Sequence, residues 1–458
     1  MKKKIPVEID KLYDVKVEGL SHDGLGIAKI DGFTLFVKNG LPQERVIIKV
    51  IAAKKNYAHA TAVDWIIKSA DRVIPPCPLF EVCGGCQIQH LSYDAQLEFK
   101  QQIVKRNMEK FGKINNANVL PTIGMENPWR YRNKTQIPFG QDVLGNIVAG
   151  FYKNRSHEIV DMPECFVQTT NSDKILHQIR ELLKTYNIEP YNEKNGSGVL
   201  RHVVIRVGFN SDEIMVTFVV NTDSLPHAEL ICENLKTQFP SIKSIVKNVN
   251  KKNTNVIFGD KTETLNGEDY IVDYLDGLKF MISARSFYQV NPVQTEILYN
   301  KAVEFASISP DDIVFDAYCG IGTITLFLAR NAKQVYGVEI VPEAIKDAKI
   351  NAEVNAMTNV IFEVGKSEEV IPRLIDEGIR PNVIVVDPPR KGCDPVLLDS
   401  IIKARPARLV YVSCDSATLA RDVAILVEGG YALDVVQPVD MFPQTSHVEC
   451  VALMSRKK

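Results

Sequence analysis

A cysteine and two polar residues near the C-terminal end have the residue types that covalent catalysis needs. Cys414 directly follows residues 409–413, an apolar run with the composition of a buried strand. Further on, the segment "MFPQTSHVEC" carries His447 and Glu449 where another strand-like run begins. A nucleophilic thiol needs a partner that handles protons. We therefore take Cys414 as the candidate nucleophile and this later segment as the candidate source of its base.

Residues 271–458 alternate between strand-like and helix-like segments. This alternation would place Cys414, His447 and Glu449 at one edge of a sheet. Strand-like runs separated by helical segments occur at residues 313–317, 335–339, 360–364, 383–387 and 409–413. This pattern predicts an α/β domain, a parallel sheet with helices on both faces. Two last runs, at residues 431–436 and 447–454, predict an antiparallel hairpin at one edge of that sheet.

A glycine turn follows the first of these strands. In "DAYCGIGT", Gly320 and Gly322 allow a tight turn and close approach of a ligand to the next helix. A dinucleotide-binding fingerprint would have a third glycine where Thr325 stands, and here the turn is preceded by Asp316. Carboxylates suit a positively charged sulfonium better than a pyrophosphate. These features favour S-adenosylmethionine as the cofactor.

Two further carboxylates stand at strand ends. Glu339 ends the second strand, where it can accept hydrogen bonds from both ribose hydroxyls, and Asp387 ends the fourth in "VIVVDPPRKG". Each alone could be an ordinary loop cap. Because the carboxyl ends of parallel strands meet at one edge, we expect both acids to lie beside Cys414.

Three cysteines are closely spaced in "CPLFEVCGGC": Cys77, Cys83 and Cys86. This spacing indicates a metal site, and a closed site needs a fourth ligand, for which Cys165 in "DMPECF" is the best candidate. The spacing is compatible with zinc and with an iron–sulfur cluster.

The charge is unevenly distributed along the chain. The net charge of −2 argues against a uniformly basic nucleic-acid binder, yet residues 100–157 hold ten Lys or Arg and three Asp or Glu. Within them, "WRYRNK" mixes aromatic and cationic side chains: Trp129, Arg130, Tyr131, Arg132 and Lys134. That mixture suits single-stranded RNA, although a solvated basic face beside a packed tryptophan has the same composition.

The chain is long enough for three domains. Short glycine-broken strands predict a small five-stranded barrel over residues 1–64. Mixed patterns predict an α+β domain over residues 65–270. Its expected elements are a Ser-capped helix at 92–111, strands at 202–208 and 214–220, and a helix at 226–239. No apolar run approaches about 20 residues, so we expect a cytoplasmic protein without membrane contact, with cysteines that are reduced, metal-bound or catalytic.

Five motifs, in this order, resemble those of bacterial RNA uracil-C5 methyltransferases, and the resemblance covers essentially the whole chain. They are "FYQVN" (287–291), "DAYCGIGT" (316–323), "DPPRKG" (387–392), "SCDSATLARD" (413–422) and "FPQTSHVE" (442–449). The resemblance implies a class I, Rossmann-like methyltransferase domain at 271–458. It also implies that the N-terminal barrel is an OB-like TRAM domain that binds RNA.

The resemblance also implies roles for individual residues. Cys414 would add to C6 of uracil, and Glu449 would be the general base that removes the C5 proton. Phe287 would pack near the bound RNA. The positions that match the family's S-adenosylmethionine contacts are Gln289, Tyr318, Glu339 and Asp387.

The four cysteines match the [4Fe-4S] ligands of the ribosomal-RNA branch of the family. Members that act on transfer RNA usually lack both that cluster and the TRAM domain, so the resemblance favours 23S ribosomal RNA, with no obligate protein partner. It strengthens the prediction that residues 129–134 form an RNA surface. We expect the cluster to lie far from the catalytic sheet and to have a structural or RNA-positioning role.

One departure and several alternatives accompany this interpretation. The family usually has Asn-Pro after the nucleophile, whereas this chain has Asp415-Ser416, and a nearby carboxylate is expected to raise the pKa of the thiol. The alternatives are a transfer-RNA uracil-C5 methyltransferase, methylation of cytosine C5 or of an exocyclic amine, and a non-catalytic RNA-binding or assembly factor.

Overall fold

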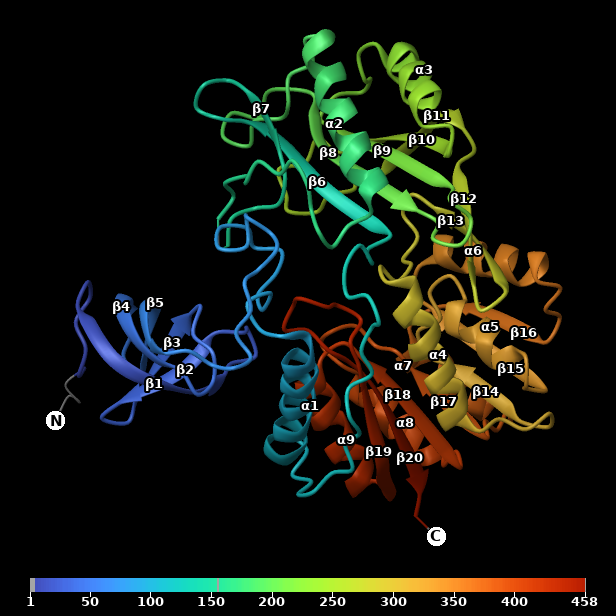
Figure 1. The fold of residues 1–458 in the computed structure, drawn as a ribbon. Coiled ribbons are helices and arrows are strands. Elements are labelled where there is room, and N and C mark those ends of the chain that lie inside the picture. The colour runs from blue at the N-terminus through green and yellow to red at the C-terminus, as the bar shows by residue number, and fades with distance from the viewer. Residues whose placement is uncertain (1–4, 155, 458) are drawn as a thin grey trace.

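A seven-stranded sheet carries the candidate site in the computed structural model, which describes residues 5–154 and 156–457 (Figure 1). Its strands are β14 (Ile313–Asp316), β15 (Gln334–Glu339), β16 (Val360–Val364), β17 (Val383–Val386), β18 (Arg408–Ser413), β19 (Tyr431–Val439) and β20 (Glu449–Arg456). The strand order is β16-β15-β14-β17-β18-β20-β19. Strands β14 to β18 are parallel, and β20 runs antiparallel between β18 and β19. The predicted parallel sheet with an antiparallel edge hairpin is confirmed.

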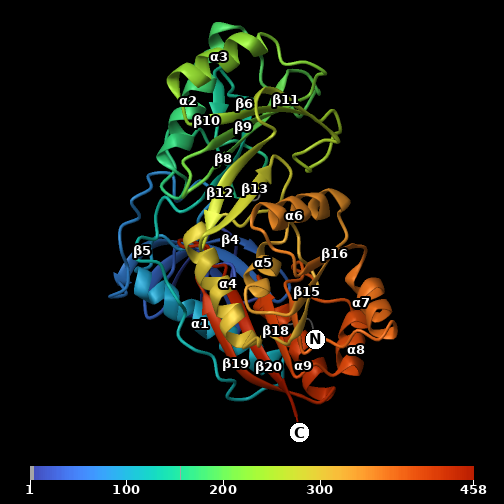
Figure 2. The same ribbon diagram turned by 90° about the vertical axis from the view of Figure 1, so that its right-hand side faces the viewer.

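Helices cover both faces of this sheet, as Figure 2 shows from the side. They are α4 (Pro292–Ala306), α5 (Thr323–Ala329), α6 (Pro342–Val354), α7 (Ser367–Asp376), α8 (Pro395–Ala404) and α9 (Ser416–Glu428). Successive strand residues alternate between two apolar clusters: Val314 and Val410 pack with α4 to α6, while Phe315 and Tyr411 pack with α7 to α9. This period of two explains why the strands read as continuous apolar runs.

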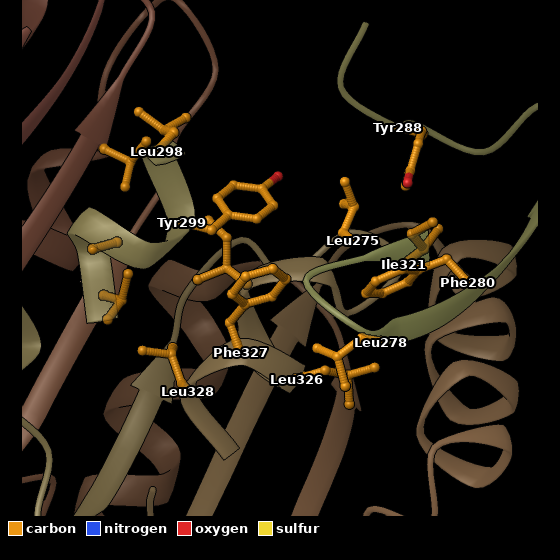
Figure 3. Packing of buried hydrophobic residues seen from close by; sticks show 14 of the residues in the cluster. Leu275, Leu278, Phe280, Tyr288, Leu298, Tyr299, Ile321, Leu326, Phe327 and Leu328 are labelled. Carbon is orange, nitrogen blue, oxygen red and sulfur yellow. The ribbon is translucent and has the colours of Figure 1, made fainter. Parts of the chain in front are cut away.

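A hairpin of β12 (Tyr270–Leu275) and β13 (Leu278–Ser283) extends the first of these cores (Figure 3). Its Leu275 and Phe280 are fully buried in the same cluster as α4 and α5. There Tyr299 of α4 meets Phe327 of α5 edge to face, with ring centroids 5.5 Å apart. These contacts fix the position of α4 beside the glycine turn that precedes α5.

Helix α1 (Tyr93–Lys110) matches the predicted helix, but it packs on the catalytic sheet although the sequence analysis assigned residues 65–270 to a central domain. Its Val104 and Met108 are buried in the cluster that contains α9. The Nζ atom of Lys100 lies 2.5 Å from Oδ1 of Asp440, and both side chains are fully buried. Ser92 is the N-cap residue, yet its side chain makes no capping hydrogen bond.

The central region contains a six-stranded sheet in the order β11-β10-β9-β8-β6-β7. Its elements are β6 (Lys134–Gln141), β7 (Ile147–Ala149), α2 (Thr170–Thr185), β8 (Leu200–Val207), β9 (Ile214–Val220), α3 (Ala228–Gln238), β10 (Ile242–Val249) and β11 (Lys261–Gly267). Helices α2 and α3 share an apolar cluster with one face of this sheet.

The N-terminal region is the predicted five-stranded barrel, closed in the order β1-β2-β3-β5-β4 (Figure 1). Its strands are β1 (Leu12–Leu20), β2 (Gly26–Ile30), β3 (Phe33–Lys38), β4 (Arg45–Ala53) and β5 (Tyr57–Ile67). The buried carboxylate of Glu44 accepts a 2.6 Å hydrogen bond from Arg72 Nε, which ties the barrel to the segment leading to the cysteines. Among the helices that the structure describes, none has the length and apolar character needed to cross a membrane.

Candidate active site

A cavity of about 850 Å³ opens at the carboxyl edge of the seven-stranded sheet. It brings together the residues that the sequence suggested for cofactor binding and catalysis: Phe287, Gln289, Tyr318, Glu339, Asp387, Cys414, His447 and Glu449. These side chains come from strand ends and from the loops before α4 and β20. Their convergence follows from the strand order, because parallel strands present their carboxyl ends at one edge.

Cys414 and Glu449 are placed side by side by strand register. Ser413, the last residue of β18, pairs with Cys450 of β20. One step further along each antiparallel strand are Cys414 and Glu449. Glu449 is 4% exposed, and Cys414 is partly buried.

The pKa values of both groups are raised, which favours their protonated forms. Burial, and then the charge of Asp387, raise the pKa of Glu449 to about 8. Burial, followed by the charges of Glu449 and Asp387, raises the pKa of the Cys414 thiol to about 11. Arg390 acts in the opposite sense on both pKa values. Arg390 was not among the residues predicted from the sequence, although it stands inside the motif "DPPRKG" as the cation that follows a strand-end acid.

Asp415 has a local structural role. Its Oδ1 accepts hydrogen bonds from the backbone N–H groups of Ala417, at 2.9 Å, and Thr418, at 3.1 Å, and so caps α9. The hydroxyl of Ser416 accepts a 2.8 Å hydrogen bond from Asn107 Nδ2 on α1. The expected rise in the pKa of the thiol is present, but the carboxylates that contribute to it are Glu449 and Asp387.

The glycine turn has the conformation that its sequence requires. Gly320 and Gly322 have φ values of +54° and +83°, in the left-handed region that favours glycine. Thr325, in the place of a third glycine, donates a 2.6 Å hydrogen bond to Asp316 Oδ2. Asp316 is fully buried beneath the turn and does not line the cavity, and its burial raises its pKa to about 6.

Glu339 supports the same turn from the next strand. Its Oε2 accepts a 3.2 Å hydrogen bond from the N–H of Gly320, and its Oε1 accepts one of 2.9 Å from Val341. Burial, and then the charge of Asp316, raise the pKa of Asp387 to about 7. Several acids held close together favour a cationic ligand, because a cation stabilises their ionised forms. The cavity therefore fits S-adenosylmethionine, whose sulfonium is positive.

The four cysteines selected from the sequence line a separate cavity of about 70 Å³: Cys77, Cys83, Cys86 and Cys165. Within the described ranges, no three His, Cys, Asp or Glu side chains come together around one metal ion. Four thiols spread around a cavity suit a cluster in which each iron takes one thiolate.

The cysteine loop reaches the catalytic cavity, so the expectation that it lies far from the sheet is wrong. Gly84, Gly85 and Gln87 line the catalytic cavity, and Gly85 lines the cysteine cavity as well. The loop is anchored by the N–H groups of Gln87 and Ile88, which both donate to the carbonyl of Gln444 at 3.1 Å. Gln444 belongs to "FPQTSHVE", the segment that leads into β20. Sequence spacing gave no signal of this long-range contact.

The predicted RNA surface at residues 129–134 divides into two parts. Trp129 packs against Phe166, with ring centroids 6.3 Å apart, and Arg130 pairs with Asp173 at 2.7 Å. Arg130 also donates to the carbonyl of Cys165 at 2.6 Å. These contacts give Trp129 and Arg130 a structural role in place of the expected RNA contact.

Arg132 and Lys134 differ from their neighbours, because neither side chain has an ion-pair or hydrogen-bond partner in residues 5–154 and 156–457. Arg132 lines the catalytic cavity and the cysteine cavity. Phe287 is 65% exposed where it lines the catalytic cavity. These three side chains remain available to a ligand.

Two family models match the chain. Residues 92–457 match the family "tRNA (Uracil-5-)-methyltransferase", and residues 6–63 match the TRAM domain. The second match covers the closed barrel, and the first begins at the cap of α1. Helix α1 thus lies within the methyltransferase match, in agreement with its packing on the catalytic sheet.

Similar proteins span the whole chain. Proteins named uncharacterized RNA methyltransferases from Halalkalibacterium halodurans and Clostridium acetobutylicum are 53% and 50% identical, each over 100% of this chain and 99% of their own. The crystal structure of Pyrococcus abyssi tRNA (uracil-54, C5)-methyltransferase with S-adenosyl-L-homocysteine superposes with a TM-score of 0.77. It is 29% identical and covers 96% of this chain and 100% of its own. The chain belongs to the family of RNA uracil-C5 methyltransferases, with an N-terminal TRAM domain.

Proposed function

We propose that this protein methylates C5 of uridine in 23S ribosomal RNA through a covalent bond between Cys414 and C6 of the base. The observation that carries the proposal is the placement of Cys414 and Glu449 together in the cavity that Glu339, Asp387 and the glycine turn also line. The TRAM barrel at the N-terminus would bind RNA, the region of residues 65–270 would hold the cluster, and residues 271–458 would transfer the methyl group.

The chemistry explains why a thiol and a carboxylate are needed together. C5 of uracil is a weak nucleophile, and addition of the Cys414 sulfur to C6 moves electron density to C5 as an enolate. S-adenosylmethionine, held by Gln289, Tyr318, Glu339 and Asp387, would supply the electrophilic methyl group. Glu449 then takes the C5 proton, the C5–C6 double bond re-forms, and the C6–S bond breaks to release the thiolate.

The protonation states of the free protein define what must change before reaction. Cys414 has to lose the proton that burial helps it keep, and Glu449 becomes a base only after losing its own. The positive charge of Arg390 favours loss of both protons, and so does the positive charge of the cofactor. Binding of the positively charged cofactor would therefore favour deprotonation of Cys414 and Glu449 before the uridine reacts.

We further propose that Cys77, Cys83, Cys86 and Cys165 hold a [4Fe-4S] cluster. Support comes from the four thiols that line one cavity and from their match to the cluster ligands of the ribosomal-RNA branch of the family. The cluster would cross-link the loop whose Gly84, Gly85 and Gln87 form a wall of the catalytic cavity. Iron and acid-labile sulfide content of the anaerobically purified protein tests this. About four of each per chain is expected, and Cys86→Ser should lower both.

Transfer RNA is the second candidate substrate. The solved structure that covers 96% of this chain is named as a transfer-RNA enzyme that acts on uracil 54. The barrel does not separate the two candidates, because a match over 96% of this chain includes most of it. The 23S ribosomal RNA assignment is supported by the resemblance of the four cysteines to the ligands of the ribosomal-RNA branch.

The deciding experiment uses anaerobically purified protein, methyl-labelled S-adenosylmethionine, and separate unmodified 23S ribosomal RNA and transfer-RNA transcripts. Nucleosides are identified by mass for the wild type and for Cys414→Ala. Formation of 5-methyluridine in the 23S transcript by the wild type alone is expected. Label in the transfer RNA alone selects the second candidate, label on cytidine overturns the choice of base, and RNA binding without transfer indicates a non-catalytic factor.

A further inference from the structure

The central sheet carries a third cavity, of about 380 Å³, which no step of the proposed reaction uses. Its lining comes from β6, from β8 and from the loops beside them, and includes Lys134, Phe151, Tyr152, His157, Arg201 and His202. Arg132 lines this cavity and the catalytic cavity. The two cavities therefore lie next to each other, with one unpaired guanidinium at their junction.

The strand register places like charges opposite each other beside this cavity. Lys134 of β6 pairs directly with Arg206 of β8 in the antiparallel ladder. Like charges in such a position are destabilising. Burial, together with the charges of Arg206 and Arg132, lowers the pKa of Lys134 to about 7. Arg206 donates to the backbone carbonyls of Ala284 and Ser286 and has no carboxylate partner among the residues that the structure describes.

Arg201 adds a third cation without a counter-charge. It is 5% exposed, and its Nη1 donates to the carbonyls of Asn250 and Lys252 at 2.9 Å and 2.8 Å. The acidic residue in the lining, Glu193, is already occupied: it accepts a 3.2 Å hydrogen bond from Tyr152 and lies 3.1 Å from Nδ1 of His157. Arg201 also lies 4.4 Å from the centre of the Tyr191 ring, so its guanidinium is occupied. Arg132 and Lys134, which have no side-chain partner among the described residues, are the cations of this lining that are available to an anion from outside the chain.

Ring-bearing side chains lie beside these cations. The rings of Tyr152 and His157 are 5.6 Å apart and tilted, and Phe151 lines the same space. The Nδ1 atom of His202 is buried without a hydrogen-bond partner, and burial lowers the pKa of His202 to about 4, so its ring is neutral. A neutral imidazole offers one donor and one acceptor, which a base edge or a ribose 2′-hydroxyl can meet.

We propose that this cavity binds one nucleotide of the substrate RNA, other than the methylated uridine, with its phosphate at Lys134 and its base against Tyr152 and His202. The inference rests on the proposed RNA substrate and adds a second point of recognition to it. Cations that meet a phosphate next to rings that stack on a base are how single-stranded RNA is held. Through Arg132, the backbone can continue from this cavity to Cys414.

The test is Lys134→Met, with Lys184→Met as the matched control, because Lys184 is an exposed cation of the same region that pairs with Glu181. The probe is whichever of the 23S ribosomal RNA and transfer-RNA transcripts the wild type binds. Lys134→Met should weaken RNA binding about 10-fold and lower the slope of log affinity against log salt by about 1. Its melting temperature without RNA should rise, because the like-charge pair is removed. Binding of S-adenosylhomocysteine should not change.

If Lys134 had a purely structural role, Lys134→Met would lower the melting temperature. Lys134→Arg keeps the positive charge and should keep RNA affinity. The inference is overturned if Lys134→Met binds RNA with wild-type affinity and salt dependence, or if Lys184→Met loses as much affinity. A 4-thiouridine crosslink from a nucleotide other than the methylated one to the peptide with Tyr152 supports it. Absence of methylation by the wild type would refute the proposed function, and a selective loss of RNA affinity in Lys134→Met would still establish the cavity.

Discussion

The catalytic cavity and the cavity on the central sheet have opposite electrostatic characters. The first gathers carboxyl groups whose pKa values are raised by burial and by each other, Asp387 and Glu449 foremost. The second gathers cations without carboxylate partners, with Lys134 set directly opposite Arg206. Each arrangement opposes folding in the free protein. Each would be relieved by a ligand of opposite charge, a sulfonium in one case and a phosphate in the other.

This contrast shows how charge can indicate ligands that the structure does not contain. A buried ion pair satisfies itself, as Lys100 and Asp440 do, and so says little about function. A group of like charges held together by the fold requires another explanation. The acids lie where the proposed chemistry would occur and the cations where RNA would be held, so substitutions should separate turnover from binding.

The largest expected effect is that of Cys414→Ala. It should lower the rate of methyl transfer at least about 1,000-fold, because C5 is not activated without the thiolate. RNA affinity should stay within about twofold of the wild type, since the cations of the other cavity are unchanged. Single-turnover transfer and equilibrium RNA binding measure the two quantities. Substantial residual transfer would favour amine methylation, in which the amine itself attacks the methyl group and no enzyme thiol is needed.

The next effect is on cofactor binding. Asp387→Asn should weaken S-adenosylmethionine binding roughly 10- to 100-fold, because a carboxylate that attracts the positive sulfonium is replaced by a neutral amide. The neutral sulfur of S-adenosylhomocysteine should make its affinity less sensitive to this change. Calorimetric titration of both ligands checks the difference. Equal losses for the two would place Asp387 away from the sulfonium.

The stability of the two cavities should respond to pH in opposite directions. Asp387 and Glu449 have raised pKa values, so the folded protein binds more protons there, and their contribution to stability falls as pH rises from about 4 to about 8. The lowered pKa of Lys134 makes its contribution rise from about pH 7 to about pH 10.5. Melting curves of Asp387→Asn and Lys134→Met, each compared with the wild type across pH, should differ in these separate windows. If the two variants changed stability over the same pH range only, the predicted difference between the two cavities would be wrong.

The smallest effect concerns a charge outside both cavities. Asp415→Asn keeps the oxygen that caps α9, so stability should be nearly unchanged, whereas Asp415→Ala should cost about 1 kcal/mol. The pH profile of Cys414 alkylation should be the same in Asp415→Asn as in the wild type, because Glu449 and Asp387 set the field at the thiol. A shifted pH profile would show that the charge of Asp415 does act on the Cys414 thiol.

The strand ends are the most predictable part of the site. The alternation of strands and helices along the chain is enough to place Glu339, Asp387 and Cys414 at one edge of a sheet, because that geometry follows from parallel pairing alone. Asp415 could also have been interpreted from sequence: an aspartate followed by a helix-length segment is a standard N-cap signal. The barrel is equally visible in its short, glycine-broken strands.

Contacts between distant segments are the unpredictable part. Nothing local in Gln87 indicates that its N–H donates to Gln444, and so the cysteine loop was expected far from the cavity it lines. Arg130 and Lys134 look alike in "WRYRNK", yet Asp173 neutralises the first and nothing in the described chain neutralises the second. Whether a cationic side chain has a structural role depends on its ion-pair partner, and tertiary packing brings that partner to it.

The position of α1 has a consequence for the order in which the chain can fold during synthesis. Lys100 and Asp440, whose ion pair joins α1 to the end of the catalytic sheet, are separated by 340 residues. Helix α1 emerges from the ribosome long before α9 and β19, against which it packs. The barrel and central sheet can form in sequence order, but the catalytic core closes only when nearly the whole chain is available. Until then the apolar face of α1 is exposed, so this enzyme should rely on chaperones most during the last part of its translation.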